Sequence, residues 1–247
     1  MPRSRTFLSV TSDRTQPQLP RLTGLLYILY FIAGSPLLVR SSLVVPGNAV
    51  ATAGKIVASE ALYRVTIVTD LVSYVLYLGL AYLFYLLLRE VRPRWALLGA
   101  VFTAAGCIVL ITVTTFLTAP LALLTGDLAR TIPVPERQEL ALLALRLYQQ
   151  GFVIALFLFG VQWLIMGPLF ARSRFVPTAI GYLLTAGGIG WVSFAIASLV
   201  APAVGLAMQP IALILGSLGE IALALWLLIR GATMQGENVS FAEASSE

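Results

Sequence analysis

Six long apolar stretches run through this chain and leave little sequence between them. They cover Leu22–Val39, Leu71–Leu88, Trp95–Ala119, Leu147–Phe170, Thr178–Val200 and Ile211–Ile229. Each has about the 17 to 25 residues that a helix needs to cross a hydrocarbon core roughly 30 Å thick. The only charged residue inside these stretches is Glu220, in the middle of the sixth. We therefore expect an integral membrane protein with one acid buried among its helices.

The composition argues against a soluble fold. Of the 247 residues, 59% are hydrophobic and 11% are charged, whereas soluble domains are about 25% charged. The segments between the stretches are too short to hold a separate soluble domain. We predict an all-α fold, a polytopic transmembrane bundle of six helices that form three hairpins in contact with the lipid bilayer.

The chain is expected to divide into one membrane domain and two tails. Residues 1–20 are predicted to be a disordered cytoplasmic tail, residues 21–231 the six-helix domain, and residues 232–247 a flexible cytoplasmic tail. The first tail is polar and lacks the apolar core that a secretory signal needs. The first span is therefore expected to stay in place as an anchor.

Basic residues predict the orientation in the membrane. Counted on alternate sides of the six spans, ten fall on one side: Arg3, Arg5, Arg14, Arg21, Arg89, Arg92, Arg94, Arg172, Arg174 and Arg230. Six fall on the other: Arg40, Lys55, Arg64, Arg130, Arg137 and Arg146. Cytoplasmic loops carry the excess of Arg and Lys, so both termini are predicted to be cytoplasmic, and the membrane is expected to be a plasma (inner) membrane.

Two external loops differ in character. Asn48 can cap a short amphipathic helix that continues to Glu60, and this helix is expected to lie on the outer membrane surface. The segment from Thr125 to Glu139 is polar and contains two prolines, which predicts an irregular loop.

Glu220 is the residue that most needs an explanation. Counted along the helices at about 1.5 Å per residue, it lies near the membrane midplane, at a depth that Gln162, Tyr77 and Tyr30 can share. A carboxylate at this depth is costly, and acids in such places are often functional. One interpretation is that Glu220 exchanges a proton, or binds a cation or the polar group of a lipophilic ligand. The other is that a protonated Glu220 joins helices by hydrogen bonds.

A second polar level is predicted near the outer surface. Asp70 lies at the outer end of the second span, and Arg64 and Arg146 lie at similar heights. An ion pair between Asp70 and one of these arginines would fix two helices together, or would mark the entrance for a ligand from outside.

Several functional classes are excluded by the residue types. The chain has no histidine and a single cysteine, Cys107, which lies within an apolar span. Histidine-based metal sites, haem ligation and Ser-His or Cys-His catalysis all need an imidazole. We therefore expect no metal site, no cofactor and no catalytic residue. The arginines lie at span ends, as membrane topology requires, so no nucleic-acid partner is expected.

Several segments resemble a family of bacterial membrane proteins that is catalogued as domain of unknown function 4386. They read RLTGLLY at 21–27, VRSSLVVPGN at 39–48, LYRVTIVTDL at 62–71 and GE at 219–220. The similarity extends over about residues 21–231 and implies a multi-pass membrane protein, without an activity or ligand. The resemblance implies that Arg64, Asp70 and Glu220 occupy positions that belong to the sequence pattern of the family. The chain differs from the pattern at 100–106, which has no arginine or acid, and at Gln162, which stands in place of a histidine.

Three functions are consistent with these observations. The first is a non-enzymatic protein that binds, or also transports, a small lipophilic or cationic ligand through a polar layer around Glu220. The second is an accessory or structural subunit that packs against a membrane-protein partner or against a second copy of itself. The third is a membrane-embedded enzyme acting on lipid or quinone, but without histidine this function has few acid–base groups.

Overall fold

A computed structural model describes the backbone of residues 18–126 and 131–244, and the side chains of 18–126 and 131–229. All regular structure in this part of the chain is helical. The helices are α1 (Gln18–Gly34), α2 (Pro36–Leu43), α3 (Ala49–Ala58), α4 (Glu60–Leu88), α5 (Pro93–Val113), α6 (Thr115–Leu124), α7 (Val134–Arg172), α8 (Thr178–Val200) and α9 (Pro202–Ala244). Together they confirm the predicted all-α fold.

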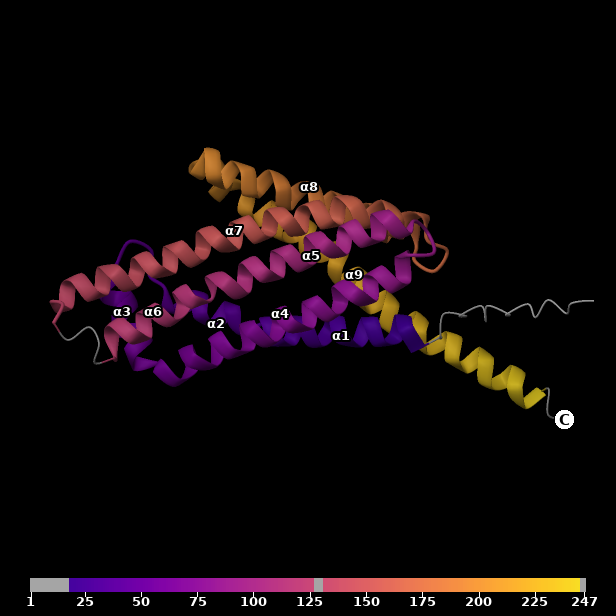
Figure 1. Ribbon diagram of the computed structural model, residues 1–247, viewed down its shortest axis with the longest axis horizontal. Coiled ribbons are helices and arrows are strands. Elements are labelled where there is room, and N and C mark those ends of the chain that lie inside the picture. The colour runs from indigo at the N-terminus through magenta and orange to yellow at the C-terminus, as the bar shows by residue number, and fades with distance from the viewer. Residues whose placement is uncertain (1–17, 127–130, 245–247) are drawn as a thin grey trace, which may run out of the picture.

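Six helical segments are long and apolar enough to cross a membrane, as predicted. They are Gln18–Leu43, Glu60–Leu88, Pro93–Leu124, Val134–Arg172, Thr178–Val200 and Pro202–Ile229. The helices run roughly along the long axis of an elongated bundle (Figure 1). Around this bundle α1, α4, α5, α7, α8 and α9 each pack against the next, and α9 closes the ring by packing against α1. Neighbours in sequence are thus neighbours in space, which is the arrangement of three successive hairpins.

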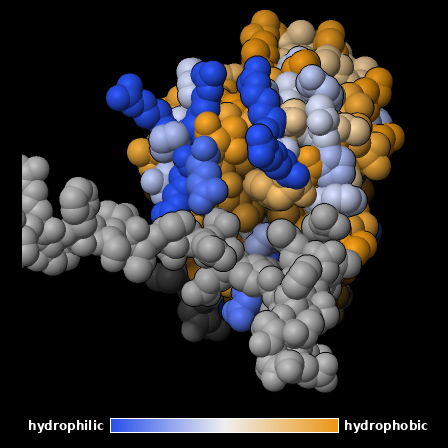
Figure 2. Space-filling view, turned by 90° about the vertical axis from the view of Figure 1, so that its right-hand side faces the viewer, coloured by the Kyte–Doolittle hydropathy of each residue, from blue (hydrophilic) through white to orange (hydrophobic). Residues whose placement is uncertain are grey.

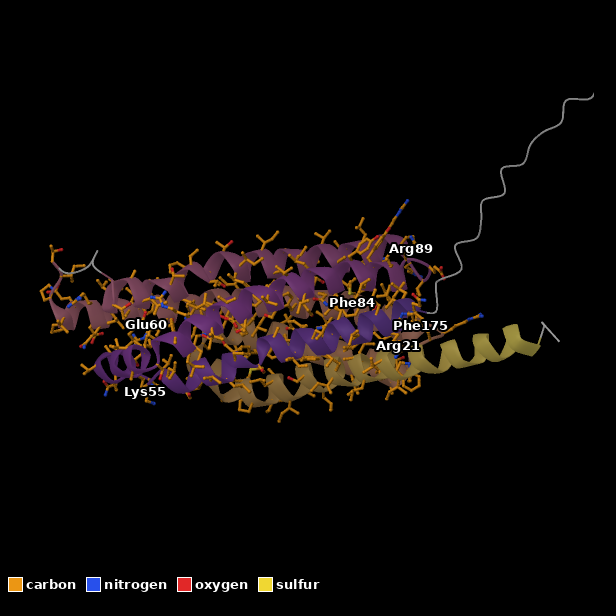
Figure 3. All side chains as sticks on the ribbon, turned by 90° about the horizontal axis from the view of Figure 1, so that it is seen from below. Arg21, Lys55, Glu60, Phe84, Arg89 and Phe175 are labelled. Carbon is orange, nitrogen blue, oxygen red and sulfur yellow. The ribbon has the colours of Figure 1, made fainter. Side chains whose placement is uncertain are left out.

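Apolar side chains cover the sides of the bundle. Leu38, Val75, Ile108, Ile189 and Ile214, from five different helices, are all more than half exposed. Hydrophilic side chains gather at the end formed by the α4–α5 and α7–α8 connections (Figure 2). Arg21 and Arg89 lie at this end, while Lys55 and Glu60 lie at the opposite end (Figure 3). This distribution suits a bilayer around the middle of the bundle.

The first and third spans are each broken by a local feature. Between α1 and α2 the chain turns at Ser35, and Pro36 begins α2, where a missing N–H costs nothing. Between α5 and α6 the hydroxyl of Thr114 bonds to the carbonyl of Leu110 at 2.8 Å. Such bonds from Thr back to the preceding turn bend helices. The break at Ser35 has the larger effect on the site, because α2 carries Arg40.

The two regions that were predicted to be external have the expected local structure in part. Asn48 caps α3 by accepting a hydrogen bond from the backbone N–H of Ala51 at 2.9 Å. The helix packs against α6 and α7 through side chains that include Ala53 and Ile56, while its placement on the membrane surface remains a prediction. The predicted irregular loop to Glu139 is wrong in its second part, because α7 begins at Val134. Prolines beside that residue are tolerated in the first turn of a helix.

The two predicted tails lie largely outside the described residues. Residues 1–17 and 245–247 are not described, so disorder at 1–20 stays a prediction, although α1 already begins at Gln18. Helix α9 continues beyond residue 231 to Ala244, so residues 232–244 are helical. Their predicted flexibility and cytoplasmic location remain predictions.

Glycines allow α1 and α9 to approach closely. A Cβ added at Gly24 would lie 2.5 Å from the backbone nitrogen of Leu228 and 2.8 Å from its Cα. On α9, the small residues Ala212 and Ala224 are buried. Because backbone atoms cannot move aside as a flexible side chain can, Gly24 fixes the distance between these two helices.

We expect Gly24→Ala to destabilise the bundle by about 1 to 3 kcal/mol, because the added methyl group overlaps backbone. The measurement is the midpoint of thermal unfolding of purified protein in a mild detergent. Gly54→Ala on α3 is the matched control, since a Cβ there meets nothing within 4 Å. Equal midpoints for the two variants would contradict the close approach of α1 and α9.

Candidate functional site

Glu220 holds three helices together through its carboxyl group. The hydroxyl of Tyr27, on α1, donates a hydrogen bond to Oε2 at 2.7 Å. The indole N–H of Trp163, on α7, donates to Oε1 at 3.0 Å. Tyr27 is 0% exposed and Trp163 is 1% exposed, whereas Glu220 is half-buried. The carboxyl group therefore joins α9 to one buried donor on α1 and another on α7.

Aromatic rings form a continuous cluster around these donors. The ring of Tyr27 stacks on Phe31 with centroids 5.0 Å apart and meets Phe84 edge-on at 5.6 Å. Phe84 also contacts the ring of Trp163 at 5.8 Å. The centroid of Tyr77 lies 6.4 Å from that of Tyr27. The two donors to the carboxyl group thus belong to a cluster of closely packed aromatic rings.

The other predicted members of the midplane layer lie next to this cluster, in a second polar contact. The Tyr77 hydroxyl and the Gln162 side-chain amide lie 3.4 Å apart, a long hydrogen bond with either group as donor. The ring of Tyr30 stacks on that of Tyr77 at 4.6 Å. Gln162 is 0% exposed, but its hydrogen bond goes to Tyr77 and not to Glu220. Only Tyr27 and Trp163 donate to the carboxyl group among the described residues.

Sequence reasoning missed both of these donors. Tyr27 lies one helical turn before Tyr30, and a depth count along straight helices cannot tell which of the two meets Glu220. For Trp163 a signal was present, because tryptophans in membrane proteins prefer the interfaces. A tryptophan in the middle of a span, beside Gln162, indicates that its indole N–H has a partner there.

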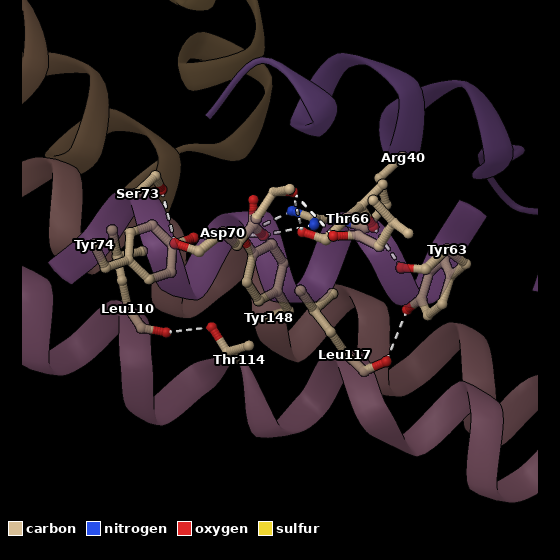
Figure 4. A network of polar contacts seen from close by, with 12 residues as sticks. Arg40, Tyr63, Thr66, Asp70, Ser73, Tyr74, Leu110, Thr114, Leu117 and Tyr148 are labelled. Atoms are coloured by element: carbon tan, nitrogen blue, oxygen red, sulfur yellow. Dashed lines mark hydrogen bonds and ion pairs between the residues drawn. The ribbon is translucent and has the colours of Figure 1, made fainter. Parts of the chain in front are cut away.

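A second polar network lies between α2, α4 and α7, toward the end of the bundle at which Lys55 and Glu60 lie. Arg40 forms an ion pair with Asp70 at 2.5 Å, and each side chain is 3% exposed (Figure 4). Arg40 also donates to the hydroxyl of Tyr148 at 3.0 Å, and its guanidinium lies 5.1 Å from the centroid of that ring. The hydroxyls of Tyr148 and Tyr74 lie 3.1 Å apart. Within this network, the opposite charges of Arg40 and Asp70 neutralise each other in a buried part of the bundle.

The predicted partners of Asp70 were wrong. Arg64 pairs with Glu60 on its own helix at 2.7 Å and is exposed. Six residues before Asp70, it lies about 120° away around the helix and cannot face the same neighbour. Arg146 is also exposed, and the α7 residue that does reach Asp70 is Tyr148, at 3.4 Å. Arg40 takes the place that the other two arginines were expected to fill.

Arg40 was missed because the first span was predicted to end at Val39, with the arginine in the loop. The break at Ser35 and the new helix from Pro36 carry it back into the bundle instead. A proline shortly before an isolated arginine, next to a span with an unpartnered acid, is the signal that could have suggested this pair.

The residues of the inner face of α4 connect the two levels. Asp70, Tyr74 and Tyr77 are all buried, and their spacing of four and three residues places them on one face of the helix. In the part of the chain that the structure describes, no group of three or more His, Cys, Asp or Glu could hold a metal ion. The chemistry present is therefore a carboxyl group with hydroxyl, indole and amide neighbours, together with a separate, internally paired arginine.

Fold and site together define a polytopic α-helical membrane protein with a half-buried acid beside an aromatic cluster. The family model described as Domain of unknown function (DUF4386) matches residues 22–231. The chain belongs to this family, as the resemblance predicted. Comparison with curated proteins found no match. Comparison with solved structures also found none.

Proposed function

We propose that this membrane protein binds a small lipophilic cation beside Glu220, and that transport of such a ligand is its physiological role. The observation that supports this proposal is the combination of one carboxyl group with the aromatic rings around Tyr27 and Trp163. A carboxylate supplies charge complementarity, and the half-buried rings of Tyr30 and Phe31, which neighbour Tyr27, can add attraction for a cation that has left water.

Access from the lipid is part of the proposal. Glu220 is half-buried, and so are Tyr30 and Phe31 on the neighbouring turn of α1. A ligand dissolved in the bilayer would approach the carboxyl group beside α1 and α9 without crossing the core. This route suits a lipophilic ligand, whose concentration is highest within the membrane.

The membrane and the orientation are also proposals. Arg92, Arg94, Arg172 and Arg174 are exposed and lie in or beside the α4–α5 and α7–α8 connections. Hydrophilic side chains gather at this end of the bundle (Figure 2). An excess of arginine at one end supports a cytoplasmic location for that end and for both termini. We propose a plasma membrane of a bacterium as the setting.

A second candidate is an accessory subunit in which Glu220 serves packing alone, with a membrane-protein partner or a second copy of the chain. The observation in its favour is that both carboxyl oxygens already accept a hydrogen bond, from two different helices. Interhelical hydrogen bonds of this kind stabilise membrane proteins by about 0.6 to 2 kcal/mol. If Glu220 serves packing alone, its substitution would alter the assembly or the stability of the protein and would not affect the binding of a ligand.

The test is the affinity of the purified full chain in lipid nanodiscs for tetraphenylphosphonium and benzyltriethylammonium. We expect wild type to bind at least one of them and Glu220→Gln to bind it at least about tenfold more weakly, a loss of about 1.4 kcal/mol. Glutamine keeps an oxygen acceptor and nearly the same volume, so the variant should fold. Glu90→Gln, at an exposed site, is the matched control and should bind as wild type does.

Two results would contradict cation binding. Neither probe binding to folded wild type would exclude the proposed site. Equal affinity of wild type and Glu220→Gln would place any binding elsewhere. A loss of stability or of a co-purifying polypeptide in Glu220→Gln, without cation binding in wild type, would favour the accessory subunit.

A further inference from the structure

We propose that Glu220 exchanges one proton for each monovalent cation it binds, so that the site works as a proton-for-cation exchanger. This inference rests on the proposed function, because it concerns the same carboxyl group and the same class of ligand. Its basis is the kind of neighbours that the carboxyl group has within the bundle.

The hydrogen bonds that the Glu220 carboxyl group accepts from the described residues come from neutral donors. Trp163 carries an indole, which donates one hydrogen bond and has no charge in either state. Tyr27 carries a phenol, which is neutral at physiological pH. Arg40 is the buried arginine of the bundle described above, and it is already paired with Asp70. The charge of an ionised Glu220 therefore has no protein counter-ion within the described residues.

The other helices around the site add no charge either. Tyr30 and Tyr77, from α1 and α4, and Cys107, from α5, are the further titratable groups near the cluster. On the far side of α9, helix α8 contains no Asp, Glu, Lys or Arg, and its one tyrosine, Tyr182, is 66% exposed. All these groups are neutral at pH 7 when unperturbed.

An isolated carboxylate within hydrocarbon is costly and is stable only when it is neutralised. Two agents can neutralise Glu220: a proton on one of its oxygens, or a cationic ligand beside it. With a proton present, Oε2–H can donate to the Tyr27 oxygen, while Oε1 still accepts from Trp163. Both states therefore keep the hydrogen bonds that join the helices.

The two neutralising agents exclude one another. A bound cation beside the protonated acid would leave a net positive charge in the site, and loss of both would leave a net negative charge. Binding is then written as COOH plus ligand cation giving carboxylate–cation pair plus one released proton, with charge and atoms balanced. No oxidant, reductant or further reactant takes part.

The experiment uses the full chain in nanodiscs, with whichever of the two cations above it binds. Proton release is followed with a pH indicator in weakly buffered solution at pH 7, and affinity is measured between pH 5 and pH 8. We expect release of about one proton per bound cation. The dissociation constant should rise by up to tenfold for each unit of decreasing pH, because protons compete for the same oxygen atoms.

Control variants separate this inference from the proposed function. Glu220→Gln should release no proton on addition of the cation, whereas Glu90→Gln should behave as wild type. Cation binding that depends on Glu220 but releases no proton, with an affinity constant between pH 5 and pH 8, would overturn the exchange and leave the binding site intact. Absence of any Glu220-dependent binding would overturn the proposed function itself.

Discussion

Replacing Arg40 by Leu should destabilise the protein by about 3 to 5 kcal/mol, although the arginine lies at the end of a short helix. The substitution leaves Asp70 buried without its counter-ion, in a region where its carboxyl group is 3% exposed. The cost of an uncompensated buried charge exceeds the cost of losing the attraction itself. The measurement is unfolding by denaturing detergent, followed by circular dichroism.

The double variant Arg40→Leu/Asp70→Leu tests this reason. With both charges removed, most of the stability should return, because the desolvation of each charge also disappears. Arg64→Leu is the matched control, since that arginine is 56% exposed and pairs within one helix. It should cost less than about 1 kcal/mol. A double variant that is as unstable as Arg40→Leu would show that α2 depends on its arginine for shape and not for charge.

Replacing Trp163 by Ala should cost about 3 to 5 kcal/mol and weaken the attachment of α9. The ring is 1% exposed and packs edge-on against Phe84, so its removal leaves a large cavity. It also removes one of the two donors to Glu220. Thermal unfolding in detergent measures the loss.

Two further tryptophan variants separate packing from hydrogen bonding. Trp163→Phe keeps most of the ring and loses the donor, so it should cost about 1 to 2 kcal/mol. Trp95→Ala, at a residue that is 50% exposed, should change the midpoint little. If Trp163→Phe is as stable as wild type, the contact between indole and carboxyl contributes nothing to the fold.

The sequence predicts the fold well because bilayer thickness imposes a length on each apolar stretch. All six spans, their pairing and the cap at Asn48 follow from length, turn chemistry and capping. The midplane layer was predicted in part: Glu220, Gln162, Tyr77 and Tyr30 do lie in one region of the bundle, but the donors to Glu220 were different residues. Which side chains of two helices meet depends on how each helix is rotated about its axis and on the angle at which the helices cross. The periodicity of a single sequence determines neither.

The ion pair of Asp70 shows the same limit more strongly. Asp70 was expected to have a basic partner, and it has one. Which arginine pairs with Asp70 depends on where the first span breaks. A hydropathy profile does not register a break inside an apolar stretch. Arg64 and Arg146 were predicted as partners only because they lie at about the same depth in the membrane as Asp70. To meet Asp70, a side chain must also point toward it from the right angle around its own helix axis.

Span one joins both of its neighbours in the ring through polar side chains that lie on either side of the turn at Ser35. Tyr27, on α1, donates to Glu220 on α9, and Arg40, on α2, pairs with Asp70 on α4. The two residues are 13 apart, so on one uninterrupted helix they would point about 140° away from each other. Because α9 and α4 are the helices that pack against α1, this separation lets one span serve both polar networks. A rotation of α2 against α1 at this turn would therefore disturb one polar network and leave the other in place.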